Sequence, residues 1–175
     1  EKLFHYLYRR YPRSSEDGRN FIQYIDFFPQ YMIQLTENID IEFIRKANPC
    51  IASDSFFGSV GTYMQELTKF IGLSGVHIRT KPNPAFLDTI PHPNERNMGP
   101  VSKLTAQKNG DMGLFFNGDG SIIGAVSPQG KIIRNELISA LILDEWLKFR
   151  GENFDIYTEI FTPETAYNLL KQYSK

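Results

Sequence analysis

Oxygen-bearing side chains alternate with glycines in one short stretch of the chain. The stretch reads Asn117-Gly118-Asp119-Gly120-Ser121, and apolar residues flank it on both sides. The glycines let the backbone turn tightly, because they adopt positive φ angles without a steric penalty. The side chains of Asn117, Asp119 and Ser121 could then converge on one point, and oxygen atoms are the ligands that Mg²⁺ takes in proteins. The spacing indicates a candidate metal loop in which only Asp119 carries a charge.

The same stretch also has the sequence of a plain β-hairpin turn. Asn-Gly and Asp-Gly between two apolar runs are strong hairpin signals that require no ligand. A single carboxylate holds Mg²⁺ poorly, since this ion gives up its hydration water reluctantly. A metal loop and a ligand-free hairpin are both open at this point.

The composition is that of an ordinary soluble globular protein. The chain has 175 residues, of which 41% are hydrophobic, and a formal net charge of −1. It shows no Lys/Arg cluster, which argues against nucleic acid as a partner. No apolar run reaches the roughly 20 residues that cross a bilayer, so we expect no membrane partner. The single cysteine, Cys50, is typical of a buried structural thiol and fits a cytoplasmic location.

The central part of the chain contains a strand, a helix and a second strand in about thirty residues, the size of a βαβ unit. Residues 50–54 form a short apolar run, residues 60–71 have apolar positions at helical spacing, and residues 74–80 alternate like a strand. This order predicts an α/β fold. Asp54 ends the first strand, where α/β proteins often bind ligands. Its alternative role is to cap the next helix or to brace the turn.

Periodicity and capping residues predict the remaining elements. A strand is expected at 21–27 and another at 154–161. The helix that begins at Asn135 has so broad an apolar face that we expect a sheet, and a second domain, to bury it. The other expected helices are 1–11, 29–38, 41–47 with Asp40 as its cap, 100–108, and one that opens at Thr162.

Three loop motifs follow one another in a recognisable order. Residues 54–61 (Asp-Ser-Phe-Phe-Gly-Ser-Val-Gly) form a glycine turn after a strand, and residues 91–98 (Pro-His-Pro-Asn-Glu-Arg-Asn-Met) form a proline-rich loop. Residues 117–122 (Asn-Gly-Asp-Gly-Ser-Ile) form the hairpin turn, and Gly-Ala-Val follows at 124–126. This order resembles the second domain of the α-D-phosphohexomutases, the family of phosphoglucomutase and phosphomannomutase. The resemblance implies a three-layer αβα domain with a mixed central sheet flanked by helices.

The resemblance also implies an arrangement of domains. Residues 28–151 correspond to the second domain, residues 1–27 to the end of the preceding domain and a linker, and residues 152–175 to the opening strand and helix of a following domain. Because the first residue is Glu1, we expect this chain to be a piece of a longer polypeptide, and by itself inactive.

The family transfers a phosphoryl group between the 1- and 6-positions of a hexose through a phosphoserine, and three aspartates hold the Mg²⁺. The resemblance therefore implies an isomerase of carbohydrate metabolism, with a hexose phosphate as the partner of the parent protein. Of the aspartate positions, only Asp119 keeps a carboxylate, because Asn117 and Ser121 offer neutral oxygens. Ile122 stands where the family has arginine. Binding of Mg²⁺ at these three residues should therefore be much weaker.

Two functions remain open. The chain could be the metal-loop domain of an active mutase, or a degenerate mutase domain with a structural or protein-interaction role and no metal. His92, between two prolines, could contact a phosphate, and its alternative is an exposed loop histidine without a role. The apolar terminal segments predict self-association of the chain, or addition of strand 154–161 to the main sheet.

Overall fold

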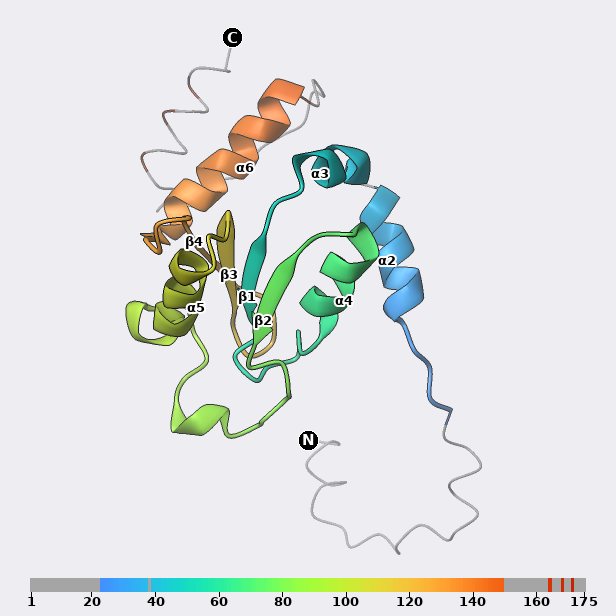
Figure 1. The fold of residues 1–175 in the computed structure, drawn as a ribbon, viewed down its shortest axis with the longest axis vertical. Coiled ribbons are helices and arrows are strands. Elements are labelled where there is room, and N and C mark those ends of the chain that lie inside the picture. The colour runs from blue at the N-terminus through green and yellow to red at the C-terminus, as the bar shows by residue number, and fades with distance from the viewer. Residues whose placement is uncertain (1–22, 38, 150–163, 165–167, 169–170, 172–175) are drawn as a thin grey trace, which may run out of the picture. The chain divides into compact units, whose positions relative to one another are not determined.

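The computed structural model describes residues 23–149 except residue 38, together with Glu164, Asn168 and Lys171 (Figure 1). The chain divides into two compact units, residues 1–39 and 40–175. The expected helix at 1–11 and strand at 154–161 lie outside the described residues. Glu164, Asn168 and Lys171 are helical, as the pattern after Thr162 predicts.

The first unit contributes helix α2, Phe28–Glu37, with Pro29 in its first turn. The strand expected at 21–27 is wrong for its described part, because residues 23–27 have no regular structure. An apolar run becomes a strand only where a neighbouring strand pairs with it. Here the Asp26 carboxylate accepts a hydrogen bond from Phe28 N at 3.0 Å and starts the helix instead.

The second unit is built on a mixed five-stranded sheet, which confirms the α/β class. The strands lie in the order β2-β1-β3-β4-β5. Strand β1 pairs in parallel with β2 and β3, whereas β4 pairs antiparallel with β3 and β5. The bounds are Ile51–Asp54 for β1, Gly75–Ile78 for β2, Met112–Phe116 for β3, Ile123–Val126 for β4 and Ile132–Ile133 for β5.

Two crossover helices cover opposite faces of this sheet. Helix α4, Tyr63–Ile71, joins β1 to β2, and helix α5, Glu95–Gln107, joins β2 to β3. Parallel crossovers are right-handed, and β2 and β3 flank β1 on opposite sides, so the two helices must lie on different faces (Figure 1). The predicted three-layer αβα arrangement follows.

Two further α-helices, α3 and α6, belong to this unit. Helix α3, Ile41–Ala47, packs on α4, and its predicted cap is confirmed, because the Asp40 carboxylate accepts from Phe43 N at 2.9 Å. Helix α6, Asn135–Phe149, packs on β4. Only part of its apolar surface is covered: Ala140 is buried, whereas Leu141 and Ile142 are each 57% exposed. The expected burial of a broad α6 face is therefore not met within the described residues.

Helix α5 begins five residues earlier than the sequence predicts. The Asn94 side chain accepts a hydrogen bond from Asn97 N at 2.9 Å, so it caps the first turn. The density of prolines around this cap suggested a loop, yet α5 accommodates Pro100 in its interior at the loss of one backbone hydrogen bond.

The hydrophobic core lies between α5 and the sheet. Its centre consists of side chains with no exposed surface, Val101 from α5, Phe115 from β3 and Val126 from β4, and Phe56 and Met98 pack around them. Full burial of each such side chain contributes about 1.5–3 kcal/mol to folding. This core supports the loops that follow β1 and β3. Within the described part of the chain, no helix is both long and apolar enough to cross a membrane.

Candidate functional site

Three loops meet at the carboxyl edge of the parallel strands. They follow β1 (residues 55–62), β2 (residues 79–94) and β3 (residues 117–122). The connection from β1 leads to β2 on one side of it, and the connection from β2 leads back past β1 to β3 on the other side. Ligands of open α/β sheets bind where neighbouring connections diverge in this way, which here is between β1 and β3. Asp54 pairs in register with Phe115, two residues before Asn117. The sheet thus brings two of the predicted site residues to one edge.

The three loops touch through their backbones. Ser59 N donates to Gly118 O at 2.8 Å, and Gly118 N donates to Pro91 O at 3.3 Å. A Cβ atom on Gly58 would lie 2.5 Å from Gly118 O, and one on Gly118 would lie 2.8 Å from Pro91 Cγ. Only glycine permits this approach at either position.

The predicted metal-loop residues do come together in the β3–β4 loop. The Asn117 amide nitrogen donates to Ser121 Oγ at 3.2 Å, and the Ser121 hydroxyl donates to Asp119 Oδ1 at 2.6 Å. Asn117 Oδ1 accepts from Ile122 N at 2.8 Å. Hydrogen bonds from the Ser121 hydroxyl and backbone N–H lower the pKa of Asp119. Hydrogen bonds therefore link the three side chains in the order Asn117, Ser121, Asp119.

This donor set does not fit Mg²⁺. Asp119 supplies the loop's one carboxylate, the Asn117 carbonyl is held by Ile122 N, and the Ser121 hydroxyl is directed at Asp119. Magnesium sites in proteins rely on carboxylate oxygens and near-octahedral geometry. Across the residues that the structure describes, no three His, Cys, Asp or Glu side chains are grouped to hold a metal ion. The loop combines the hydrogen bonds of a hairpin turn with one carboxylate, that of Asp119.

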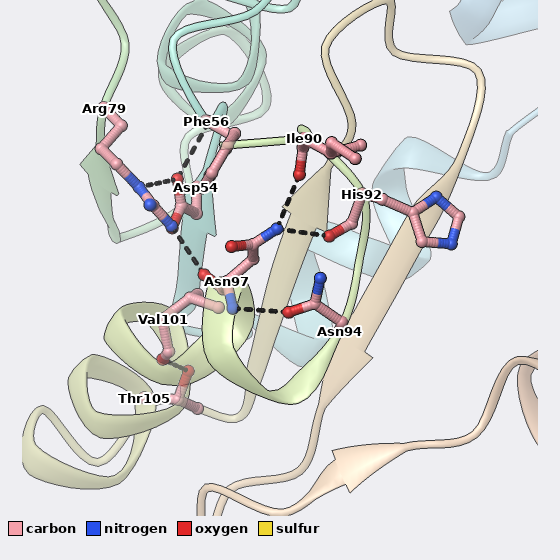
Figure 2. A network of polar contacts seen from close by, with 9 residues as sticks. All are labelled: Asp54, Phe56, Arg79, Ile90, His92, Asn94, Asn97, Val101 and Thr105. Carbon is pink, nitrogen blue, oxygen red and sulfur yellow. Dashed lines mark hydrogen bonds and ion pairs between the residues drawn. The ribbon is translucent and has the colours of Figure 1, made fainter. Parts of the chain in front are cut away.

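Asp54 is enclosed at the end of β1 and makes all its contacts within the protein (Figure 2). Its side chain is 0% exposed, and Arg79 Nε donates to Oδ1 at 2.8 Å and to Oδ2 at 3.0 Å, with a further contact from Arg79 Nη2. Phe56 N donates to Oδ1 at 2.9 Å. In this conformation the carboxylate braces the turn, which was the alternative to ligand binding.

Sequence reasoning missed Arg79 and Asn97. Arg79 has a left-handed backbone, with φ +51°, and its guanidinium lies 4.2 Å from the centre of the Phe56 ring. Asn97 is 4% exposed, and its amide nitrogen donates to Ile90 O at 2.9 Å and to His92 O at 2.8 Å. A basic residue directly after β2, beside the strand that ends in Asp54, was the one available signal for the ion pair.

An open depression lies beside these loops, with a volume of about 470 Å³. His92, Asn117 and Asp119 line it, whereas Asp54 and Ser121 do not. His92 is exposed, and Figure 2 shows its ring directed away from the Asn97 contacts. The remaining lining is mostly apolar and comes from Phe86, Ile90, Pro91 and Gly118.

Comparison with known proteins identifies the family to which this fold belongs. Residues 29–130 match the family model of phosphoglucomutase/phosphomannomutase, alpha/beta/alpha domain II. The chain belongs to the phosphoglucomutase/phosphomannomutase family. The mixed sheet, the two crossover helices and the hairpin loop are thus the second-domain architecture of that family.

Two sequence relatives and one solved structure illustrate the similarity. The chain is 24% identical over 147 residues to a phosphoglucomutase/phosphomannomutase of Thermococcus kodakarensis, covering 84% of this chain and 32% of the relative. It is 26% identical over 157 residues to a phosphomannomutase/phosphoglucomutase of Pseudomonas aeruginosa, covering 89% and 33%. The fold resembles the open form of pp63/parafusin, a phosphoglucomutase from Paramecium, with a TM-score of 0.70 and 13% identity over 86% of this chain and 28% of that one. The chain spans about a third of the length of the curated relatives that it matches.

Proposed function

We propose that this chain is the second domain of a phosphohexomutase-like protein and serves there as a scaffold and interaction domain without its own Mg²⁺. The domain would span residues 28–151, flanked by the end of one domain at 1–27 and the start of another at 152–175. One observation carries the proposal: Asp119 is the single carboxylate of a loop in which the Asn117 carbonyl and the Ser121 hydroxyl are already engaged in hydrogen bonds within the turn.

A second candidate is the metal-loop domain of an active mutase. Its parent would interconvert a hexose 1-phosphate and a hexose 6-phosphate by phosphoryl transfer, and this chain alone would be inactive. The similarity to the Thermococcus and Pseudomonas proteins supports this candidate, as does the presence of His92 and Asp119 on one depression. In that case Asp119 would be the residue whose loss abolishes metal binding.

The two candidates differ in metal binding, which calorimetry measures. Mn²⁺ and Mg²⁺ are titrated into the unmodified chain and into an Asn117→Asp/Ser121→Asp variant, and circular dichroism checks that both are folded. Under the scaffold proposal only the variant binds, because it restores three carboxylates around the turn. The variant with Asp119→Ala added should then lose that binding.

A matched control removes a carboxylate elsewhere. Glu136, exposed at the start of α6, is changed to Gln, and this should leave every titration unchanged. Specific binding by the unmodified chain, abolished by Asp119→Ala but not by Glu136→Gln, would overturn the scaffold proposal in favour of the active mutase. The next measurement would then be an assay of the parent for interconversion of hexose 1-phosphate and hexose 6-phosphate.

A further inference from the structure

The segment that lines one side of the depression has no regular structure of its own. Ile90, Pro91 and His92 belong neither to a helix nor to a strand, yet the Pro91 carbonyl must be in place to accept the Gly118 N–H of the β3–β4 loop. Something outside the segment has to hold it there.

The Asn97 side chain does this from the first turn of α5. Its amide nitrogen donates to the carbonyls on either side of Pro91, at 2.9 Å to Ile90 O and 2.8 Å to His92 O (Figure 2). One NH₂ group has two hydrogens, so both are in use. Because Asn97 is 4% exposed, water is poorly placed to replace these donors.

Asn97 is itself fixed from two directions. Its backbone N–H is bound by the capping side chain of Asn94, and its carbonyl accepts from Arg79 Nη2 at 2.8 Å. Arg79 is anchored on Asp54, which is fully buried at the end of β1. A continuous set of contacts therefore runs from the end of β1 to the Ile90–His92 segment, and from Pro91 O to the β3–β4 loop.

We propose that Asn97 is a positioning residue of the candidate site. Its side chain sets where Pro91 and His92 lie relative to the loop that carries Asn117 and Asp119. The inference deepens the proposed function and rests on it in one respect, that this edge of the sheet is the functional one. Asn97 touches no reacting group. It acts through the two carbonyls it holds and the Gly118 N–H that Pro91 receives.

Amide hydrogen exchange, read by NMR, tests the positioning directly. Asn97→Ala removes both donors, and Val101→Ala is the matched control, because it weakens the core from the same helix without removing a side-chain hydrogen bond to Ile90 or His92. Asn97→Ala should speed exchange of the Gly118 amide at least tenfold more than exchange of the core amides of β3. Val101→Ala should speed both alike, as a general loss of stability does. If Asn97→Ala fails to fold, Asn97→Leu keeps most of the size of the side chain and removes the same donors without adding a charge.

A metal titration then connects position to the site. In the Asn117→Asp/Ser121→Asp background, Asn97→Ala should weaken Mn²⁺ binding at least fivefold, whereas Val101→Ala should leave it within twofold. A failure of the background chain to bind Mn²⁺ would contradict the claim that the scaffold is intact, and the exchange data would still decide the role of Asn97. Gly118 exchange that rises no more in Asn97→Ala than in Val101→Ala, or equal Mn²⁺ affinities in the two, would overturn the proposal.

Discussion

At the end of β1, Asp54 is wholly removed from water, with 0% of its side chain exposed beside an Arg79 side chain that is 17% exposed. Burying a carboxylate costs several kcal/mol. The two-point contact with Arg79 and the hydrogen bond from Phe56 N offset this cost, and the Phe56 ring adds a favourable surface for the guanidinium. The buried carboxylate of Asp54 and the guanidinium of Arg79 therefore depend on each other for their stability at this position.

Removal of Arg79 alone should therefore be severe. We expect Arg79→Met to lower the free energy of unfolding by about 3–5 kcal/mol, because it leaves a buried charge without a partner. Urea unfolding measures the change. The control is Glu42→Gln, which breaks an ion pair with Arg45 in which Glu42 is 81% exposed, and it should cost no more than about 1 kcal/mol. Equal costs for the two variants would contradict the expectation.

His77 on β2 contacts two hydroxyl groups. Thr68 Oγ1 lies 3.0 Å from the carbonyls of Met64 and Gln65, to which it donates, so it accepts from His77 Nε2 at 3.0 Å. Nδ1 then accepts from the Ser53 hydroxyl at 2.7 Å. These contacts suit the neutral ring, and burial lowers the pKa of His77 from 6.5.

Stability should consequently fall as the pH is lowered. The unfolded chain takes up the His77 proton near pH 6.5 and the folded chain only at a lower pH, so the unfolded state binds more protons between those values. We expect the His77 ring to titrate with a midpoint below 6.5 by NMR. We also expect His77→Gln to reduce the loss of unfolding free energy between about pH 7.5 and pH 5.5. A midpoint at or above 6.5 would refute both.

At the scale of elements, three loops share their backbone contacts at one edge of the sheet. The closest approach joins Gly58 after β1 to Gly118 after β3. The backbone hydrogen bonds from Ser59 N to Gly118 O and from Gly118 N to Pro91 O therefore help to hold the β3–β4 loop in place.

An added methyl group tests this approach. Gly58→Ala would place a Cβ atom 2.5 Å from Gly118 O, and overpacking of this kind costs about 1–3 kcal/mol. Thermal unfolding should show the loss, together with shifted NMR signals of the β3–β4 loop. Ser59→Ala, which alters the exposed neighbour without adding atoms, should stay within about 0.5 kcal/mol. Wild-type loop signals in Gly58→Ala would show that the contact is not structural.

Local patterns predicted the elements that depend on local interactions. The cap at Asp40, the βαβ unit around α4 and the hairpin of β3 and β4 all follow from neighbouring residues. The start of α5 was predicted too late, because the prolines around Asn94 indicated a loop where this residue caps the helix. Strand β5 has only two residues, too few for an alternating pattern.

The candidate site was predictable only in part, for a physical reason. Asn117, Asp119 and Ser121 lie within one turn, so their convergence can be inferred from spacing alone. The ion pair of Asp54 with Arg79 joins residues 25 positions apart, and the two bonds of Asn97 depend on a loop with no pattern. Contacts of this kind appear only once the sheet has set the register of its strands.

At the scale of the whole molecule, large apolar side chains are exposed at several places. Phe43 is 70% exposed, Ile90 80%, and Leu141 57%. Where such side chains gather into a contiguous patch of more than a few hundred Å², they mark an interaction site in soluble proteins.

We therefore expect the isolated chain to self-associate. Light scattering after size-exclusion chromatography should give a mass that rises with concentration above the 20.2 kDa of one chain. High salt should strengthen the association, because it is driven by apolar surface. A constant mass of one chain across the accessible concentrations would contradict the expectation.

Substitutions in and beside the β3–β4 loop should differ in their effect on its backbone. Its turn is closed by backbone bonds, Asn117 N to Ile122 O and Gly120 N to Asn117 O, and an aspartate at position 117 could still accept from Ile122 N. Substitutions at 117 and 121 can thus leave the backbone of the turn in place. A side chain at Gly58 or Gly118 would instead displace the loop itself. The two glycines therefore fix where the loop lies, whichever side chains stand at positions 117 and 121.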